Sequence, residues 1–227
     1  VLKPEIFSKM NATSVDLALD VTPGVDILDG QANIRGGSGY SYGAGSRVLM
    51  VLDGMPALRY DGAVSSWDNI PMENIAQVEV LKGASSVLYG SSAMNGVISF
   101  KTKDVPKIPV TTASILYRHY MQPEDDRRVW WSDTTSTPFE SMAYITHARK
   151  IKKLDFAAGI FGNFHNSFNK STKDQLGRAY LNLKYRLSPK LNIGLNTLFN
   201  AADNASFFYW KNALSGSLLP GEGTFST

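Results

Sequence analysis

Residues 78–98 read VEVLKGASSVLYGSSAMNGVI, and this stretch decides the fold. It begins with a short apolar run, residues 78–81, and ends in a second one that continues to residue 102, residues 97–102. Both runs predict strands. The middle of the stretch, residues 85–89, predicts a helical turn. Glycines separate these elements where a side chain would obstruct a tight reversal of the backbone: Gly83, Gly90 and Gly96. The stretch therefore predicts a strand, a turn and a second strand in a small α+β domain.

The residues upstream of this stretch predict further short elements with turn signals between them. Residues 14–20 predict a short helix and residues 71–75 a helical turn that begins at a proline. Residues 47–52 predict a buried strand that ends at the turn signal formed by Asp53 and Gly54. We therefore expect residues 1–105 to form one α+β domain with many loops.

Residues 106–227 follow a different pattern, in which apolar and polar side chains alternate. From Arg178 to Leu187 the odd positions are apolar and the even positions are polar. After a turn at residues 188–190, the next strand alternates in the same way. A second hairpin is predicted from Ala143 to Phe164 around a turn at residues 152–155. Tyr117 marks an earlier and less regular strand.

Alternation alone is compatible with two kinds of sheet, a soluble antiparallel sheet and a membrane barrel. Two features favour the barrel. The predicted hairpin turns are short, whereas the connections on the other side, residues 122–140 and 166–175, are long. Aromatic residues also gather at strand ends, as at residues 207–210, which is typical of an interfacial girdle.

The composition excludes several classes of protein. The chain has 227 residues and no cysteine, which excludes a disulfide scaffold and a cysteine–zinc site. Its aromatic content of 11% argues against a disordered chain, and its net charge of +3 is too small to suggest a nucleic-acid partner. The three histidines, His119, His147 and His165, stand apart from one another, so we expect no metal ligand among them and no cofactor.

The blocks of the first 105 residues, taken in order, resemble the plug domain of TonB-dependent outer-membrane receptors. The resemblance spans about residues 15–103. Its blocks, all in the family's order, are Thr22–Val25, Ile34–Gly36, Val51–Pro56, Ile70–Pro71 and residues 78–98. The amino-acid sequence of residues 82–90, with that of residues 67–71 upstream, resembles Bacteroidetes members of the family.

This resemblance implies a fold. Residues 1–105 are expected to be the α+β plug domain, and residues 106–227 the first antiparallel β-hairpins of an outer-membrane β-barrel. The family's barrel has 22 strands and encloses the plug. About 120 residues leave room for five or six strands of about ten residues or more, so the chain is expected to be the N-terminal portion of a longer protein.

The resemblance also implies a function. The chain is expected to belong to a transporter, not an enzyme, in the outer membrane of a Gram-negative bacterium. It would bind a scarce siderophore, haem, cobalamin or oligosaccharide and import it to the periplasm by a plug rearrangement that TonB drives. Its partners would be TonB (through a segment not in this chain), outer-membrane lipid and a small-molecule or glycan substrate. The alternative is a non-transport scaffold or partner subunit of a larger outer-membrane assembly with the same fold.

Candidate site residues follow from the family's positions. Arg35 and Lys82 stand where family plugs present basic groups to glutamates of the barrel wall. We call this set of ion pairs between plug and barrel the lock. Glu79 is a candidate member of the lock on the plug side. An unpaired buried charge is strongly unfavourable, so such groups need partners. The alternative is that Arg35 and Lys82 are solvated surface charges.

Aromatic and basic residues on glycine-rich stretches are candidates for contact with the substrate, because such side chains stack on sugars or chelates. The expected substrate-facing residues are Tyr40, Tyr42, Arg59, Tyr60 and Trp67. The alternative is a loop with a few packed aromatic residues.

Two further patterns have simpler explanations. Residues 39–43 match G-x-S-x-G, the pattern around a nucleophilic serine, but a strand follows them where a hydrolase needs a helix. A hydrolase would lose activity on Ser41→Ala. The basic run at residues 149–153 is most simply a solvated hairpin turn, which would face the periplasm in a barrel.

Overall fold

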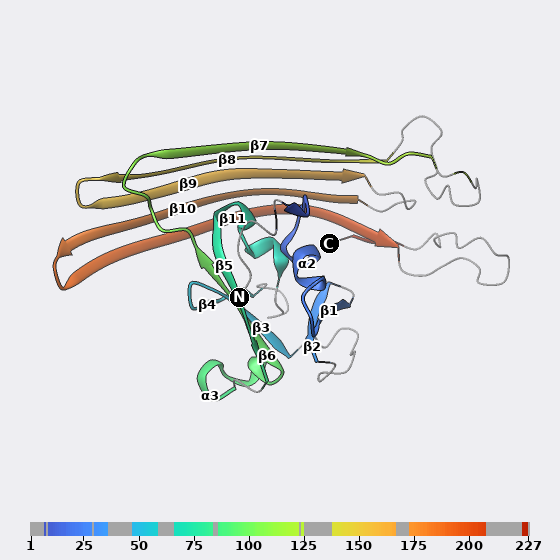
Figure 1. Ribbon diagram of the computed structural model, residues 1–227, viewed down its shortest axis with the longest axis horizontal. Helices are drawn as coiled ribbons and strands as arrows, with labels where there is room; N and C mark the ends of the chain where they lie inside the picture. Colours follow the sequence, from blue (N-terminus) through green and yellow to red (C-terminus); the bar gives the residue numbers. More distant parts are fainter. Residues whose placement is uncertain are drawn as a thin grey trace. The chain divides into compact units, whose positions relative to one another are not determined.

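Figure 1 shows the computed structural model of the chain, which divides into two compact units, Val1–Asp104 and Val105–Thr227. The residues that the structure describes are 7, 9–28, 30–35, 47–58, 66–83, 86–122, 124, 138–166, 173–207 and 224–226. No helix within these ranges has both the length and the apolar character needed to cross a membrane.

A four-stranded mixed sheet, in the order β4-β3-β6-β5, forms the centre of the first unit. Its strands are β3 (Val48–Leu52), β4 (Met55–Pro56), β5 (Ile75–Lys82) and β6 (Gly96–Thr102). β3 pairs in parallel with β6, whereas β4 and β5 join the sheet as antiparallel strands. The predicted strands are confirmed, and β5 begins three residues before the predicted start at Val78.

The turn between β3 and β4 lies at Asp53 and Gly54, as predicted. Both residues have positive φ angles, 49° and 84°, which is the geometry of a two-residue hairpin turn. The Asp53 carboxylate accepts hydrogen bonds from the Thr102 backbone N–H at 2.9 Å and from the Thr102 hydroxyl at 2.7 Å. These bonds tie the turn to the end of β6.

Smaller elements surround this sheet. They are α2 (Val15–Asp20), β1 (Val25–Leu28), β2 (Gln31–Ile34), η1 (Trp67–Asn69), η2 (Met72–Asn74), α3 (Ser86–Tyr89) and η3 (Ser91–Ala93). The predicted helix at residues 14–20 and the two predicted helical turns are present. The sequence pattern did not predict the β1–β2 hairpin, because each of its strands has only four residues and alternation over so few positions is a weak signal.

The core of the first unit lies between the sheet and these smaller elements. Its largest fully buried side chains include Phe100, Leu19, Ile34, Met50 and Ile75. They come from α2, β2, β3, β5 and β6, so every main element contributes to one hydrophobic cluster.

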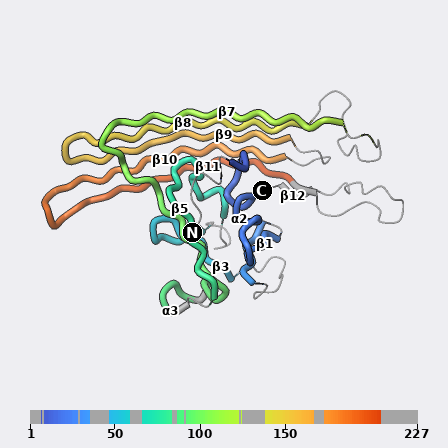
Figure 2. The backbone as a smooth tube through the Cα atoms, in the orientation of Figure 1, coloured from blue at the N-terminus to red at the C-terminus, as the bar shows by residue number. Residues whose placement is uncertain are grey.

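The second unit is an antiparallel sheet in which strands that follow each other in the chain pair with each other, in the order β12-β11-β10-β9-β8-β7 (Figure 2). Its strands are β7 (Val110–His119), β8 (Phe139–Ile151), β9 (Leu154–Asn166), β10 (Lys173–Ser188), β11 (Leu191–Phe207) and β12 (Thr224–Ser226). The predicted hairpins are confirmed.

Both short turns are tighter than the sequence pattern suggested. Ile151 pairs with Leu154, so residues 152–153 alone make the first turn and Lys152 adopts a positive φ of 52°. Ser188 pairs with Leu191 in the second hairpin. The sequence pattern centred this hairpin on residues 152–155 with Leu154 on the return strand; Leu154 does pair there, and Asp155 pairs as well, so the turn is shorter than three or four residues.

Two glycines of β9 differ in what a side chain would meet. Gly159 pairs directly with Tyr180, and a Cβ atom there would lie 2.4 Å from the Tyr180 ring, whereas Gly162 has open space. Overpacking of this kind destabilises a folded sheet, so we expect Gly159→Ala to lower the free energy of unfolding by about 1–3 kcal/mol. Gly162→Ala is the matched control and should change it by less than about 0.5 kcal/mol. Urea unfolding of the full-length protein measures both, and equal effects would contradict the packing shown.

Candidate functional site

The sheet of the second unit has two chemically different faces. Residues paired across strands share a face, and the register places the odd positions of β10 on what we call the apolar face and its even positions on the polar face. The large side chains on the apolar face that are between 41% and 86% exposed include these nine: Ile115, Tyr117, Ile145, Ile160, Phe164, Tyr185, Ile193, Leu195 and Phe199. A sheet of a soluble protein buries this face.

The apolar face extends over a limited length along the strands. Its rows run from Leu154, near the short turn of β9, to Phe164, near the other end of that strand. Ten residue steps span about 34 Å along a strand. At the strand tilt usual in membrane barrels, this is a band of about 25 Å, which matches the apolar band of such barrels.

Aromatic rings line one edge of the apolar face. Tyr117 stacks on Phe139 with ring centroids 5.8 Å apart, and Phe139 stacks on Phe164 at 5.5 Å. This edge lies at the strand ends that are joined by the long connections. Of the aromatic residues that were predicted for this role, Phe207 ends β11, and residues 208–210 lie outside the part of the chain described.

A row of polar side chains crosses the opposite face near the same strand ends. Its members are direct cross-strand neighbours on five successive strands: Arg118, Glu140, His165, Asp174 and Asn204. No sequence motif pointed to this row. Its signal was present in the turn length, since a two-residue turn at residues 152–153 places Glu140 opposite His165.

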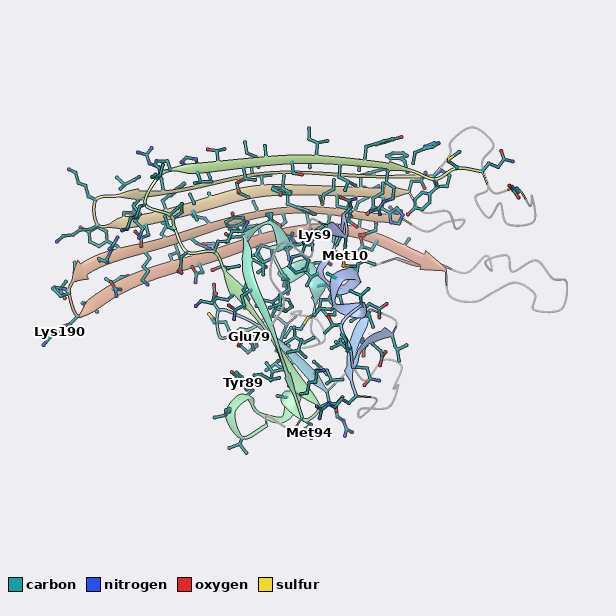
Figure 3. All side chains as sticks on the ribbon, viewed as in Figure 1. Lys9, Met10, Glu79, Tyr89, Met94 and Lys190 are labelled. Atoms are coloured by element: carbon teal, nitrogen blue, oxygen red, sulfur yellow. The ribbon has the colours of Figure 1, made fainter. Side chains whose placement is uncertain are left out.

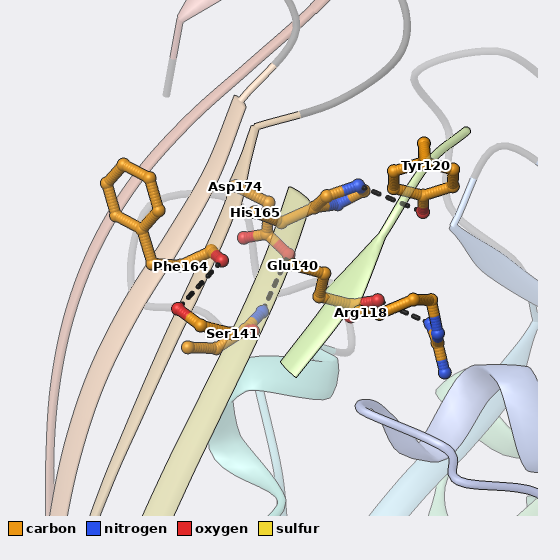
Figure 4. A network of polar contacts seen from close by, with 8 residues as sticks. Arg118, Tyr120, Glu140, Ser141, Phe164, His165 and Asp174 are labelled. Atoms are coloured by element: carbon orange, nitrogen blue, oxygen red, sulfur yellow. Dashed lines mark hydrogen bonds and ion pairs between the residues drawn. The ribbon is translucent and has the colours of Figure 1, made fainter. Parts of the chain in front are cut away.

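Members of the polar row make separate polar contacts, with one another or with a neighbouring side chain (Figure 4). The Arg118 guanidinium forms an ion pair with the Glu140 carboxylate. The Tyr120 hydroxyl lies 3.4 Å from Nε2 of His165, and the Asn163 side-chain amide donates to Asp174 at 3.4 Å. Four residues further along β10, the Arg178 guanidinium lies 4.5 Å from the centre of the Phe161 ring. The row therefore offers hydrogen-bond donors and acceptors side by side.

In the first unit, the structure brings two of the predicted lock residues together at Gly24. The Lys82 ammonium donates to the Pro23 carbonyl oxygen at 2.7 Å, and the Arg35 backbone N–H donates to the Gly24 carbonyl oxygen at 3.0 Å. A Cβ atom at Gly24 would lie 3.3 Å from Nζ of Lys82 and 3.8 Å from Cγ of Arg35. We call Arg35 and Lys82 the basic pair. Both are exposed, and neither forms an ion pair with another residue that the structure describes.

The structure does not bring Glu79 to the basic pair. Glu79 lies on β5 (Figure 3), where its carboxylate accepts a hydrogen bond from the Gln77 side chain. Successive residues of a strand point to opposite faces, so Glu79 and Lys82, three positions apart, lie on opposite sides of β5. Trp67 is half-buried, packs against the core and donates from its indole N–H to the Gly30 carbonyl oxygen at 2.5 Å.

Other predicted site residues divide into two groups. The turn glycines Gly54, Gly83, Gly90 and Gly96 all have positive φ angles, between 82° and 147°. Tyr40, Tyr42, Arg59 and Tyr60, and the G-x-S-x-G pattern at residues 39–43, lie outside the described residues. Across the described ranges, no group of three histidine or acidic side chains is placed to hold a metal ion.

Comparison with known proteins shows what the first unit is similar to. Residues 1–97 match the family model described as the TonB-dependent receptor plug domain. Heme/hemopexin utilization protein C of Haemophilus influenzae is 38% identical over 100 residues, which cover 44% of this chain and 14% of that protein. The chain therefore corresponds to a small part of the length of this relative. The resemblance of the first unit to a plug domain is confirmed.

Two solved structures share the fold of both units. One is the siderophore receptor PirA from Acinetobacter baumannii, with a TM-score of 0.69 and 17% identity over 99% of this chain and 35% of that chain. The other is the RagAB peptide importer in its "open-open" state, with a TM-score of 0.68 and 16% identity over 95% of this chain and 31% of that chain. An α+β unit followed by long antiparallel strands is thus a fold that this chain shares with these two proteins.

Proposed function

We propose that the chain is part of a TonB-dependent receptor of the outer membrane, in which residues 1–104 are the plug and β7 to β11 are membrane-spanning strands of a barrel of the 22-stranded class. The observation that carries the proposal is the exposed apolar face of the second unit, next in the chain to a segment that matches the plug-domain family. The amino-acid sequence of residues 82–90 supports the proposal that the chain belongs to a Bacteroidetes receptor.

Energetics support a membrane location for the second unit. Full burial of a large apolar side chain gives about 1.5–3 kcal/mol, and the exposed parts of these nine side chains together forgo an amount comparable to a domain's usual stability. In a bilayer the same side chains contact lipid, and the stacked aromatic rings lie at one edge of the band, where barrels place interfacial aromatic residues.

The polar face then belongs to the interior of the barrel, where the solute would pass. The polar row that begins at Arg118 supports this assignment, because its alternating donors and acceptors suit a hydrated surface and not a lipid one. We propose that the solute is a scarce nutrient of the siderophore, haem, cobalamin or oligosaccharide classes. Relatives named for haem utilization and as a siderophore receptor support the first two.

Import would use energy delivered by TonB in the periplasm, and the plug would rearrange during transport. Deletion of TonB is therefore expected to reduce uptake of the cognate ligand to background in cells that produce the full-length protein. The test measures uptake of a panel of labelled ferric siderophores, haem, cobalamin and oligosaccharides with and without TonB. Uptake that does not change without TonB would contradict transport and support the alternative, a scaffold or partner subunit.

We propose that the basic pair, Arg35 and Lys82, holds the plug against glutamates of the barrel wall. The support is that both cations are exposed side by side at Gly24 without an ion pair among the described residues. Glu79 remains a proposed member of the lock, although its position on the other side of β5 means that it would act separately from Lys82. Trp67 and the residues 40, 42, 59 and 60 remain proposed contacts of the solute.

Removal of both cations tests the lock. The double variant Arg35→Gln, Lys82→Gln is expected to weaken docking of the plug by about 3 kcal/mol, because it leaves buried wall carboxylates unpaired. Limited proteolysis of the full-length protein in a urea series measures the release of residues 1–104. Lys101→Gln, an exposed lysine on β6, is the matched control and should behave as the wild type. Equal urea midpoints for the double variant and this control would show that the pair is only solvated surface charge.

A further inference from the structure

Cations gather at one end of the second unit, and the function proposed above does not use them. The β8–β9 and β10–β11 turns lie at the same end of the sheet, on the left in Figure 1. The described strand ends and turns there carry seven basic residues: Arg149, Lys150, Lys152, Lys153, Lys184, Arg186 and Lys190. Figure 3 labels Lys190 at the tip of the second hairpin.

Few of these charges are neutralised. Asp155 is the one carboxylate on the described strand ends at this side, and it accepts from Arg186 at 2.8 Å and lies 4.0 Å from the Lys150 ammonium. Arg149, Lys152, Lys153 and Lys190 form no ion pair with any residue that the structure describes. We call these four residues the basic belt.

Arg149 lies on the apolar face, unlike its neighbour Lys150. Its cross-strand row continues with Phe156, Leu183 and Leu195, and the next row toward the turn begins with Ile151. An arginine on the lipid side of a barrel is strongly unfavourable at the bilayer midplane but nearly neutral close to the interface. One row from the end of the band, Arg149 lies where its long side chain can extend to the headgroup region.

A polar contact lies beside Arg149 on the same face. Nδ1 of His147 is 2.7 Å from the Thr111 hydroxyl, and the imidazole packs 6.3 Å from the Phe156 ring. His147 and Arg149 are therefore two adjacent polar side chains on the apolar face of β8, and apolar side chains of the neighbouring strands lie beside them. Two such side chains can accept a headgroup while the acyl chains lie along the apolar rows.

The opposite end of the sheet differs in charge. There Lys173, also on the apolar face, pairs with Asp203, and Arg118 pairs with Glu140. The excess of unpaired positive charge is thus a property of the short-turn end within the described residues, and charge complementarity with an anionic surface is confined to that end.

We propose that the basic belt binds the phosphate headgroup of an anionic phospholipid in the leaflet that surrounds the short-turn end, with Arg149 as the residue on the lipid-facing side. The guanidinium group of Arg149 suits bidentate contact with phosphate, and the turn lysines add charge. This inference rests on the proposed membrane location of the sheet and adds a specific lipid site to it.

The experiment compares lipid retention by variants of the full-length protein. The protein is reconstituted in phosphatidylethanolamine vesicles with or without phosphatidylglycerol, extracted in mild detergent, and bound lipid is counted by native mass spectrometry. Arg149→Gln is expected to reduce phosphatidylglycerol retention about fivefold, and the added changes Lys153→Gln and Lys190→Gln to reduce it further. Arg149→Lys, which keeps the charge, should retain most of the binding. Lys173→Gln is the matched control at the other end and should bind as the wild type.

The outcomes separate this inference from the proposed function. Failure of the wild type to insert into either kind of vesicle would contradict the membrane location itself. Normal insertion with equal phosphatidylglycerol retention by Arg149→Gln and Lys173→Gln would overturn the lipid site alone. Inorganic phosphate is added as a competitor, and complete displacement of the lipid by it would show binding of the anion and not of the phospholipid, which also overturns the inference.

Discussion

Gly96→Ala is expected to unfold the first unit under conditions in which the wild type is stable. Gly96 begins β6 at a φ of 147°, a conformation that residues with a side chain rarely adopt. A Cβ atom at this position would lie 2.6 Å from the Leu81 carbonyl oxygen and 2.8 Å from Cδ1 of Ile34. Backbone strain and overpacking together are expected to lower the free energy of unfolding by about 4 kcal/mol.

The contact at Gly96 can be separated from backbone strain. Gly83 also has a positive φ, 110°, but a Cβ atom there would have nothing within 4 Å. Gly83→Ala is therefore the matched control and should lower the free energy of unfolding by about 1–2 kcal/mol through strain alone. Pulse proteolysis in a urea series, with the cleavage sites within residues 1–104 identified by mass spectrometry, measures both variants. If Gly96→Ala is no less stable than Gly83→Ala, the close packing of β6 against β5 and β2 is wrong.

Ile160→Arg is expected to prevent assembly of the second unit in a membrane. Ile160 is 64% exposed and lies in the middle of the apolar face, in the row that joins Ile145, Ala179 and Phe199. A cation that faces lipid near the bilayer midplane lowers the stability of a barrel by about 2–4 kcal/mol. If this face were in contact with water instead of lipid, an arginine at this position would change stability by only about 0.5 kcal/mol.

The measurement is the amount of folded full-length protein in the outer membrane, together with its folding into lipid vesicles in a urea series. Asn196→Arg is the matched control, because Asn196 is exposed on the polar face. We expect the control to assemble as the wild type does. Normal assembly of Ile160→Arg would show that the apolar face does not contact lipid and would contradict the membrane location of these strands.

Much of the local structure could be predicted from the sequence, because the signals that decide it are short in range. The apolar run at residues 48–52 and the Asp53–Gly54 pair specify a buried strand and its turn. Strict alternation over residues 178–187 specifies an amphipathic strand. The β1–β2 hairpin escaped prediction, since four residues per strand carry too little pattern.

The lengths of the turns were harder to predict and had larger consequences. A difference of two residues at the β8–β9 turn changes which side chains are opposite each other along two strands of 13 residues. The tighter turn puts Glu140 opposite His165 and so forms the polar row. Sequence reasoning named none of the row's members as a site, because they are far apart in the chain.

The sequence by itself determined the plug-domain resemblance and the two-sided pattern of the later strands, since both depend on the order and type of neighbouring residues. Only the tertiary structure decided that the apolar side of those strands is the exposed one, and that Arg35 and Lys82 meet at Gly24. The physical reason is that alternation shows that the two faces of a strand differ in polarity. It does not show which of the two faces is buried in the folded protein. Burial and the meeting of residues distant in the chain depend on strand pairing and packing across the whole fold.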